Sequence, residues 1–144
     1  VLGRGRIGRE VGRRWAALGL EVVDHVAGAD IVSIHLPLTP QTRGSIDAAA
    51  LATVRPGAVL VNTGRGPVLD VDALIAALDS GRLAGAALDV FDHDPLPDDS
   101  PLRTRGDLLL TPHVAFYSEE ALAELRRRAA QSVVDHFAPT GGTP

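Results

Sequence analysis

Short apolar runs recur along this chain and alternate with segments that have helical periodicity. The runs rich in Val, Ile, Leu and Ala occupy residues 29–36, 58–62, 83–90 and 108–111. Each is only long enough for a strand, and a continuous apolar run is typical of a strand buried on both faces of a parallel sheet. Residues 47–54 and 71–80 have the length and spacing of helices between these strands. Strands that alternate with helices predict an α/β fold with a Rossmann-type, doubly wound parallel sheet.

The two ends of the chain extend this pattern. Residues 7–18 have the spacing of an amphipathic helix, and residues 20–23 are expected to form a short strand. Near the other end, Ser118 is expected to cap a long helix. The predicted dinucleotide-binding domain covers residues 1–138, and residues 139–144 are expected to be a loose tail.

A glycine-rich turn stands between a two-residue apolar stub and the first predicted helix. It has the spacing Gly3-x-Gly5-x-x-Gly8. In a dinucleotide site such glycines permit a tight turn, close approach of the pyrophosphate and close packing of the helix, whose free N–H groups face the phosphates. The position between a strand and a helix favours this interpretation over a glycine turn without a ligand. The stub, Val1-Leu2, leaves the first strand truncated.

The carboxylate that holds the ribose hydroxyls of a dinucleotide is expected at the end of the second strand. Asp24 follows residues 20–23 and is the nominal candidate. Residues 24–30 also have the pattern of a helix that leads into the next strand, which would make Asp24 a carboxylate at a helix start. Both interpretations stay open from the sequence.

A cation and an imidazole follow two of the predicted strands. Arg65 stands in the turn Asn62-Thr63-Gly64-Arg65-Gly66, directly after the run that ends at Val61. His113 follows the last predicted strand. Because ligands bind outside the carboxyl ends of parallel strands, both side chains are expected in one crevice. A fixed cation beside a titratable imidazole suits a substrate that carries a carboxylate next to a carbonyl or an alcohol.

Composition excludes several other classes of function. The formal net charge of −4 disfavours nonspecific binding to nucleic acid. No apolar run has the length of a membrane span. The absence of cysteine rules out disulfides and thiolate metal sites, and it fits a cytoplasmic protein. We predict no metal site.

Several motifs, in order, resemble the D-isomer-specific 2-hydroxyacid dehydrogenase family. Besides the glycine turn, they are His35-Leu36-Pro37-Leu38-Thr39-Pro40-Gln41-Thr42-Arg43-Gly44, Arg55 to Gly66, Gly85-Ala86-Ala87-Leu88-Asp89-Val90-Phe91 and Leu110-Thr111-Pro112-His113. The resemblance covers nearly the whole chain. The stretch Ala115-Phe116-Tyr117-Ser118-Glu119-Glu120 looks like the branch of this family that contains the C-terminal-binding-protein corepressors.

The resemblance implies catalytic roles for three residues. Arg65 would bind the substrate carboxylate and polarise the C2 oxygen, and His113 would exchange a proton with that oxygen. An acidic residue just before a proline would orient the imidazole and raise its pKa. That position is Asp94, before Pro95, where the family usually has the longer Glu. A loop carboxylate without a catalytic role is the alternative for Asp94, because other aspartates surround it.

The resemblance also implies a cofactor site for NAD, with NADP not excluded. Asp89 would hold the nicotinamide carboxamide. Arg6 and Ile7 match the pair beside the pyrophosphate. Positions along the rest of the cofactor are matched by Pro37, Thr42, Thr63, Gly64 and Ala115. Phe116 would lie beside the substrate, and His35 is expected to support the loop next to the cofactor.

Two departures from the family limit the implied function. The family has a separate substrate-side domain, formed mainly by the N-terminal region, which we expect to be absent here. Between Val23 and Asp24 the family has a further turn, the ribose-binding acid and another strand, roughly 25 residues or about one β-α step. We therefore expect a segment of that size to be missing at this point.

The sequence thus predicts the cofactor-binding domain of a dehydrogenase that interconverts D-2-hydroxy acids and 2-keto acids. The full-length protein is expected to be a homodimer, and the 144 residues alone are expected to be inactive. One alternative is a nonenzymatic dinucleotide-sensing or corepressor-like protein on the same fold. The other is a nucleotide-binding module for group transfer, for which a G-x-x-x-x-G-K-[ST] loop would be the signal; the sequence contains no such loop.

Overall fold

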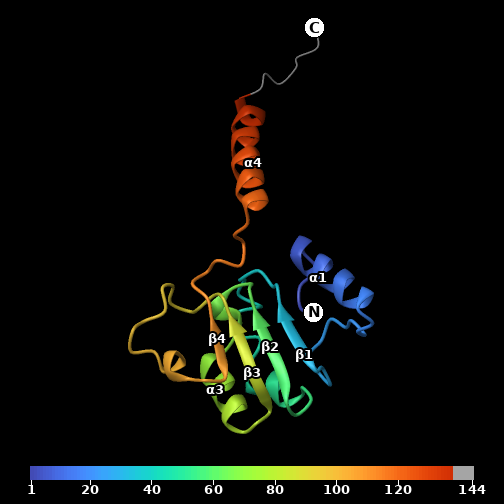
Figure 1. Ribbon diagram of the computed structural model, residues 1–144, viewed down its shortest axis with the longest axis vertical. Helices are drawn as coiled ribbons and strands as arrows, with labels where there is room; N and C mark the ends of the chain where they lie inside the picture. The colour runs from blue at the N-terminus through green and yellow to red at the C-terminus, as the bar shows by residue number, and fades with distance from the viewer. Residues whose placement is uncertain (138–144) are drawn as a thin grey trace. The chain divides into compact units, whose positions relative to one another are not determined.

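A computed structural model describes residues 1–137. The chain divides into two compact units, residues 1–113 and a second unit that begins at Val114. The first unit contains a four-stranded sheet in the order β1-β2-β3-β4, and all three neighbouring pairs are parallel (Figure 1). The strands are β1 (Ile31–Ile34), β2 (Ala58–Asn62), β3 (Leu83–Leu88) and β4 (Leu108–Leu110). The parallel α/β architecture predicted from the apolar runs is confirmed.

At the position of the truncated first strand, the structure has an isolated β-bridge. Leu2 pairs in parallel with Ile34, with its N–H donating to Ser33 O at 2.8 Å and its carbonyl accepting from His35 N at 2.7 Å. Residues 1 and 2 therefore occupy a fifth strand position beside β1. The stub is sufficient to place the glycine turn at the carboxyl edge of the sheet.

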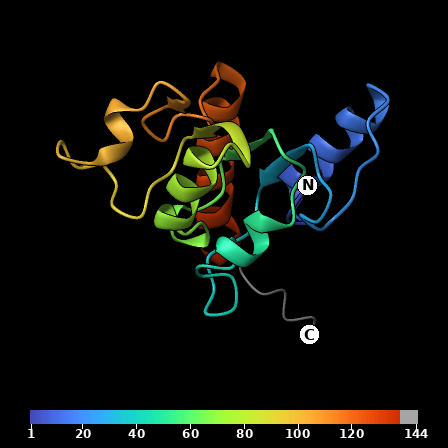
Figure 2. The same ribbon diagram turned by 90° about the horizontal axis from the view of Figure 1, so that it is seen from below.

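Two helices cover one face of the sheet. Helix α2 (Ala48–Ala52) begins at Asp47, whose carboxylate accepts from Ala50 N, and α3 (Val71–Asp79) begins at Asp70 in the same way. Gly81, at φ 71°, takes the left-handed conformation that ends α3. Figure 2 shows α2 and α3 side by side. The core between these helices and the strands is built from aliphatic side chains, including Leu51, Leu60 and Leu74.

Helix α1 (Arg6–Ala17) follows the glycine turn as expected. Residues 20–23, however, are not a strand, so that prediction is wrong. A strand needs a neighbour, and the stub offers only two residues; the Val1 amino group donates to Val23 O at 2.7 Å, which is one hydrogen bond and not a ladder. Residues 24–30 form bends and a turn, so the alternative helix in this segment is also wrong.

The remaining elements are two short 3₁₀ helices and the helix of the second unit. The 3₁₀ turns are η1 (Gly66–Val68) and η2 (Pro101–Thr104). Helix α4 (Glu119–Phe137) begins after Ser118, whose hydroxyl accepts from Ala121 N at 3.0 Å, as predicted. No helix within residues 1–137 is long and apolar enough to cross a bilayer. The expected tail, residues 139–144, lies outside the described residues, and the domain boundary at residue 138 stays a prediction.

Candidate active site

Three polar side chains follow three adjacent strands. Asp89 comes directly after β3, while Arg65 and His113 come three residues after β2 and β4. Because the strands are parallel neighbours, their carboxyl ends lie at one edge of the sheet. The placement of Arg65 and His113 at the same edge agrees with the sequence-based expectation.

A buried amide fixes the turn that carries Arg65. The side chain of Asn62 has no exposed surface, and its Oδ1 accepts from Gly64 N at 3.0 Å while its Nδ2 donates to Arg65 O at 3.2 Å. Gly66 is required for packing, because a Cβ at this position would lie 1.9 Å from Phe91 O. The role of Asn62 was not predicted, although a polar residue at the end of a buried strand was a signal for it.

His113 is paired with Asp94. His113 Nδ1 lies 2.6 Å from Asp94 Oδ2, and the two side chains are 47% and 39% exposed. An ionised carboxylate only accepts, so Nδ1 donates and Nε2 is left for another partner. His113 also has a φ of 56°, a left-handed conformation that is uncommon for residues other than glycine and is over-represented at functional sites. The shorter Asp side chain therefore reaches the imidazole.

Asp89 is a buried carboxylate between β3 and β4. Only 4% of its surface is exposed. Its Oδ1 accepts from the Thr111 hydroxyl at 2.6 Å, and its backbone N–H donates to Asn62 O at 3.0 Å. Hydrogen bonds of this kind hold a buried carboxylate in one orientation, as a group that positions a ligand requires.

The glycine turn fits the close approach of a dinucleotide. Gly3 has a φ of 104°, and a Cβ on it would lie 2.5 Å from His35 O. A Cβ on Gly8 would lie 1.9 Å from Gly3 O, whereas a Cβ on Gly5 would meet nothing within 4 Å. The first and third glycines thus serve packing, and the second leaves open space at the start of α1. No side chain caps this helix start, so its N–H groups are suited to a pyrophosphate.

The 37–44 loop is tied to the Arg65 turn. The Thr42 hydroxyl donates to Pro37 O at 2.6 Å and accepts from Thr39 N at 2.8 Å. At the end of the loop, Gly44 N donates to Pro67 O at 2.8 Å. The predicted cofactor positions Pro37 and Thr42 therefore belong to one closed loop that is linked to the turn after Arg65.

His35 lies between the glycine turn and the Arg65 turn. Its Nε2 is 2.9 Å from Ser33 Oγ, and its Nδ1 is 3.3 Å from Thr63 Oγ1. A Cβ on Gly64 would lie 3.4 Å from His35 Cα. Burial lowers the pKa of His35, which favours the neutral imidazole. The side chain links Ser33 of β1 to Thr63 of the Arg65 turn, and its predicted support of the loop beside the cofactor stays a prediction.

The other predicted site residues belong to α1 or to the second unit. Arg6 and Ile7 form the first turn of α1, and both are exposed. Ala115 and Phe116 belong to the second unit, before α4. The cofactor role of Ala115 and the substrate role of Phe116 stay predictions.

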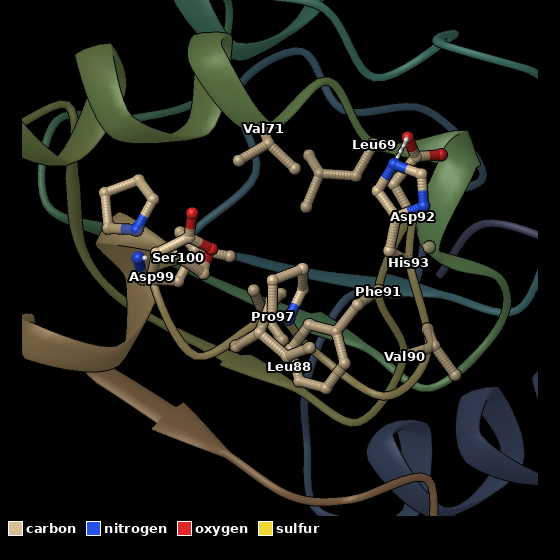
Figure 3. A pocket seen from close by; sticks show the side chains of 14 residues that line it. Leu69, Val71, Leu88, Val90, Phe91, Asp92, His93, Pro97, Asp99 and Ser100 are labelled. Atoms are coloured by element: carbon tan, nitrogen blue, oxygen red, sulfur yellow. Dashed lines mark hydrogen bonds and ion pairs between the residues drawn. The ribbon is translucent and has the colours of Figure 1, made fainter.

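A cavity of about 360 Å³ adjoins the turns that carry Arg65 and Asp94 (Figure 3). Its lining is mostly apolar and includes Leu69, Val71, Leu88, Val90, Phe91 and Pro97. Asp92 and His93 lie at one side, with His93 Nε2 3.9 Å from Asp92 Oδ2. None of the described residues that line it is an arginine, so a substrate carboxylate is expected at Arg65 instead.

Comparison with known proteins places this geometry among dehydrogenases. Residues 24–115 match the sequence family described as "D-isomer specific 2-hydroxyacid dehydrogenase, NAD binding domain". A putative 2-hydroxyacid dehydrogenase of Haemophilus influenzae is 39% identical over 155 residues, which include 92% of this chain and 49% of that protein.

Solved structures of similar fold agree with this match. A glyoxylate reductase from Paecilomyes thermophila superimposes with a TM-score of 0.87 at 30% identity, covering 96% of this chain and 48% of that one. A D-isomer specific 2-hydroxyacid dehydrogenase from Xanthobacter autotrophicus, solved with NADPH and MES, has a TM-score of 0.62 at 46% identity. The superposition covers 74% of this chain and 46% of that one.

The lengths of the aligned regions concern the two expected differences from the family, namely the substrate-side domain and the segment between Val23 and Asp24. The chain spans about half the length of the curated relatives that it matches. The alignment with the H. influenzae protein has 155 positions, although it includes only 92% of the 144 residues of this chain. That relative therefore has additional residues within the matched region. The match to the sequence family begins at residue 24, where the missing segment was predicted.

Proposed function

Because the chain belongs to the D-isomer-specific 2-hydroxyacid dehydrogenase family, we propose that it is the cofactor-binding part of an oxidoreductase that interconverts 2-hydroxy acids and 2-keto acids. The glycine turn, the helix start behind it and Asp89 would hold NAD or NADP, which accepts or donates the hydride when bound. The fit of the pyrophosphate rests on the open space beside Gly5.

The catalytic roles follow from charge and geometry. In the reductive direction, Arg65 binds the substrate carboxylate and polarises the carbonyl oxygen at C2. Protonated His113 donates its Nε2 proton to that oxygen as negative charge develops on it. Asp94 accepts from Nδ1 throughout, which fixes the tautomer and orientation of the ring. In the oxidative direction, neutral Nε2 takes the hydroxyl proton.

The single observation that carries this proposal is the 2.6 Å contact between His113 and Asp94, at the edge of the sheet where Arg65 also lies. An oriented acid/base beside a fixed cation is the arrangement that reduction of a 2-keto acid requires. A nonenzymatic dinucleotide sensor needs neither residue, so that alternative is not favoured.

The test is an assay of the full-length protein that contains this chain, with a panel of 2-keto acids and reduced cofactor. We expect cofactor oxidation with at least one 2-keto acid. Arg65→Gln should raise KM for the keto acid by about tenfold or more, since one charge-assisted contact is lost. Cofactor binding that persists while no 2-keto acid is reduced would contradict the proposed activity.

Three finer features also belong to the proposal. We infer that the full-length protein is a cytoplasmic homodimer, on the family resemblance and the absence of cysteine. The assignment of this chain to the family branch that contains the corepressors is based on residues 115–120 alone. The substrate side chain would be selected mainly by the substrate-side domain of the full-length protein.

A further inference from the structure

A second cavity, of about 630 Å³, opens beside the glycine turn and is used by none of the roles above. Its lining includes Gly3 and Gly8 from the turn, the polar residues Arg4, Arg9 and Asp24, and residues 22 and 23 before Asp24. In a dinucleotide fold, the segment that follows the second strand position lies beside the adenosine ribose. In this chain Asp24 borders the cavity directly after Val23, at the point where the segment with the ribose-binding acid is expected to be missing.

The carboxylate of Asp24 is already engaged by a cation. Arg4 Nη2 forms an ion pair with Asp24 Oδ2, and the hydrogen bond from Arg4 holds the pKa of this carboxyl below its ordinary value. The two side chains are 81% and 55% exposed, so the pair is a surface ion pair that exchanges partners at little cost. Ribose hydroxyls would therefore have to compete with Arg4 for this carboxylate.

A second guanidinium is held at the same cavity. Arg9 lies in the first turns of α1, and its Nε donates to Arg4 O at 2.8 Å. The first turn of α1 contains no acidic residue, and Gly5 supplies no side-chain cap. Among the described lining residues, Asp24 is the one carboxylate against two arginines, so the cavity has an excess of positive charge.

We propose that this cavity selects NADP(H) over NAD(H). Arg4 binds the 2′-phosphate of the adenosine ribose, and Arg9 contributes further positive charge near that phosphate. A phosphate monoester carries a charge of about −1.5 to −2 at neutral pH and binds arginine through two parallel hydrogen bonds. Asp24 holds the Arg4 guanidinium at the mouth of the cavity until the phosphate replaces it. The inference rests on the proposed dinucleotide site and specifies which dinucleotide the site takes.

The alternative, in which Asp24 binds the ribose hydroxyls of NAD(H), predicts the opposite cofactor preference. If Asp24 accepted hydrogen bonds from the ribose hydroxyls, NADH would bind more tightly than NADPH. Removing Arg4 would then free the carboxylate and strengthen NADH binding. Removing the charge of Asp24 would weaken it.

The experiment titrates the chain with NADPH and with NADH, followed by nicotinamide fluorescence, and with adenosine 2′,5′-bisphosphate and AMP, followed by calorimetry. We expect the ligands with a 2′-phosphate to bind on the order of tenfold more tightly. Arg4→Gln should remove this difference and leave NADH and AMP unchanged. Asp24→Asn should preserve or increase it, because it removes a negative charge near the phosphate.

Arg14→Gln is the matched control, since Arg14 lies on the same helix, pairs with Glu10 and does not line the cavity. It should leave the preference intact, and circular dichroism should show that all variants fold. Tighter binding of NADH, or a gain in NADH affinity in Arg4→Gln, would overturn the cofactor preference alone. No binding of any of the four ligands would instead contradict the dinucleotide site itself, and with it the proposed function.

Discussion

Asp94 Oδ2 lies 2.6 Å from His113 Nδ1, although the two residues are nineteen positions apart in the sequence, with the last strand between them. The carboxylate faces the nitrogen that does not meet the substrate in the proposed mechanism. It can therefore control the tautomer and orientation of the imidazole without touching the reacting atoms. One missing methylene, compared with the usual Glu, does not prevent the contact.

Replacing Asp94 by Asn should slow reduction of the keto acid, because the imidazole of His113 loses the carboxylate that fixes its tautomer and orientation. Turnover should fall by about tenfold or more. Steady-state kinetics of the full-length protein, with kcat and KM measured separately, check this. Asp98→Asn, on the same loop and directed to Arg103, is the control. An unchanged kcat in Asp94→Asn would show that Asp94 is a loop carboxylate without a catalytic role.

Much of this architecture follows from the sequence, because a parallel strand buried on both faces is almost purely apolar. The runs at 58–62 and 83–90 predicted β2 and β3 to within two residues. Residues 20–23 are apolar as well, yet they form no strand. Strand formation depends on a partner, and local composition does not reveal that the neighbouring position is only a two-residue stub.

Site residues were predictable where a motif fixed their position and not where tertiary contact decides their role. Arg65 and His113 follow apolar runs directly, so the position of ligands at the carboxyl ends of parallel strands located them. Whether Asp94 reaches His113 depends on the path of the 91–107 loop, which no periodicity encodes. Asn62 was missed because its function is to satisfy the backbone of the turn that follows it.

Asn62→Ala should destabilise the fold, because two hydrogen bonds to a buried turn are lost and Gly64 N is left without its acceptor. The expected loss is roughly 2 kcal/mol in the free energy of unfolding. Urea denaturation measures it. Ser80→Ala removes a side-chain hydrogen bond at an exposed helix end and should change stability by less than about 0.5 kcal/mol. Equal effects of the two changes would argue against a special role for Asn62.

The burial of His35 should make stability depend on pH. Because burial lowers its pKa in the folded chain, the unfolded chain binds a proton at higher pH than the folded chain does. The free energy of unfolding should therefore decrease as pH falls below about 6.5 and level off below the folded pKa.

The variant His35→Asn should reduce this decrease. His93→Asn should retain it, since the His93 side chain is 80% exposed. Thermal unfolding midpoints between pH 7.5 and 5 provide the comparison. A pH dependence that is identical in wild type and His35→Asn would assign the effect to other groups.

The chain of 144 residues should bind cofactor weakly and turn over no substrate. The glycine turn, Asp89 and His113 would supply one wall of a crevice, and the chain spans about half the length of its curated relatives. Catalysis requires the keto acid and the nicotinamide to be held together with water excluded, which one wall does not achieve. Fluorescence titration with reduced cofactor, followed by assays with a panel of 2-keto acids, tests both statements.

Gly5→Val separates specific from nonspecific binding in the same titration. A side chain at Gly5 meets no protein atom within 4 Å, and the residue has an ordinary φ of −69°, so the variant should fold. Its side chain would occupy the space predicted for the pyrophosphate, and cofactor binding should be lost. Robust cofactor oxidation by the wild-type chain alone would show that a substrate-side domain is dispensable, and equal binding by Gly5→Val would place the cofactor elsewhere.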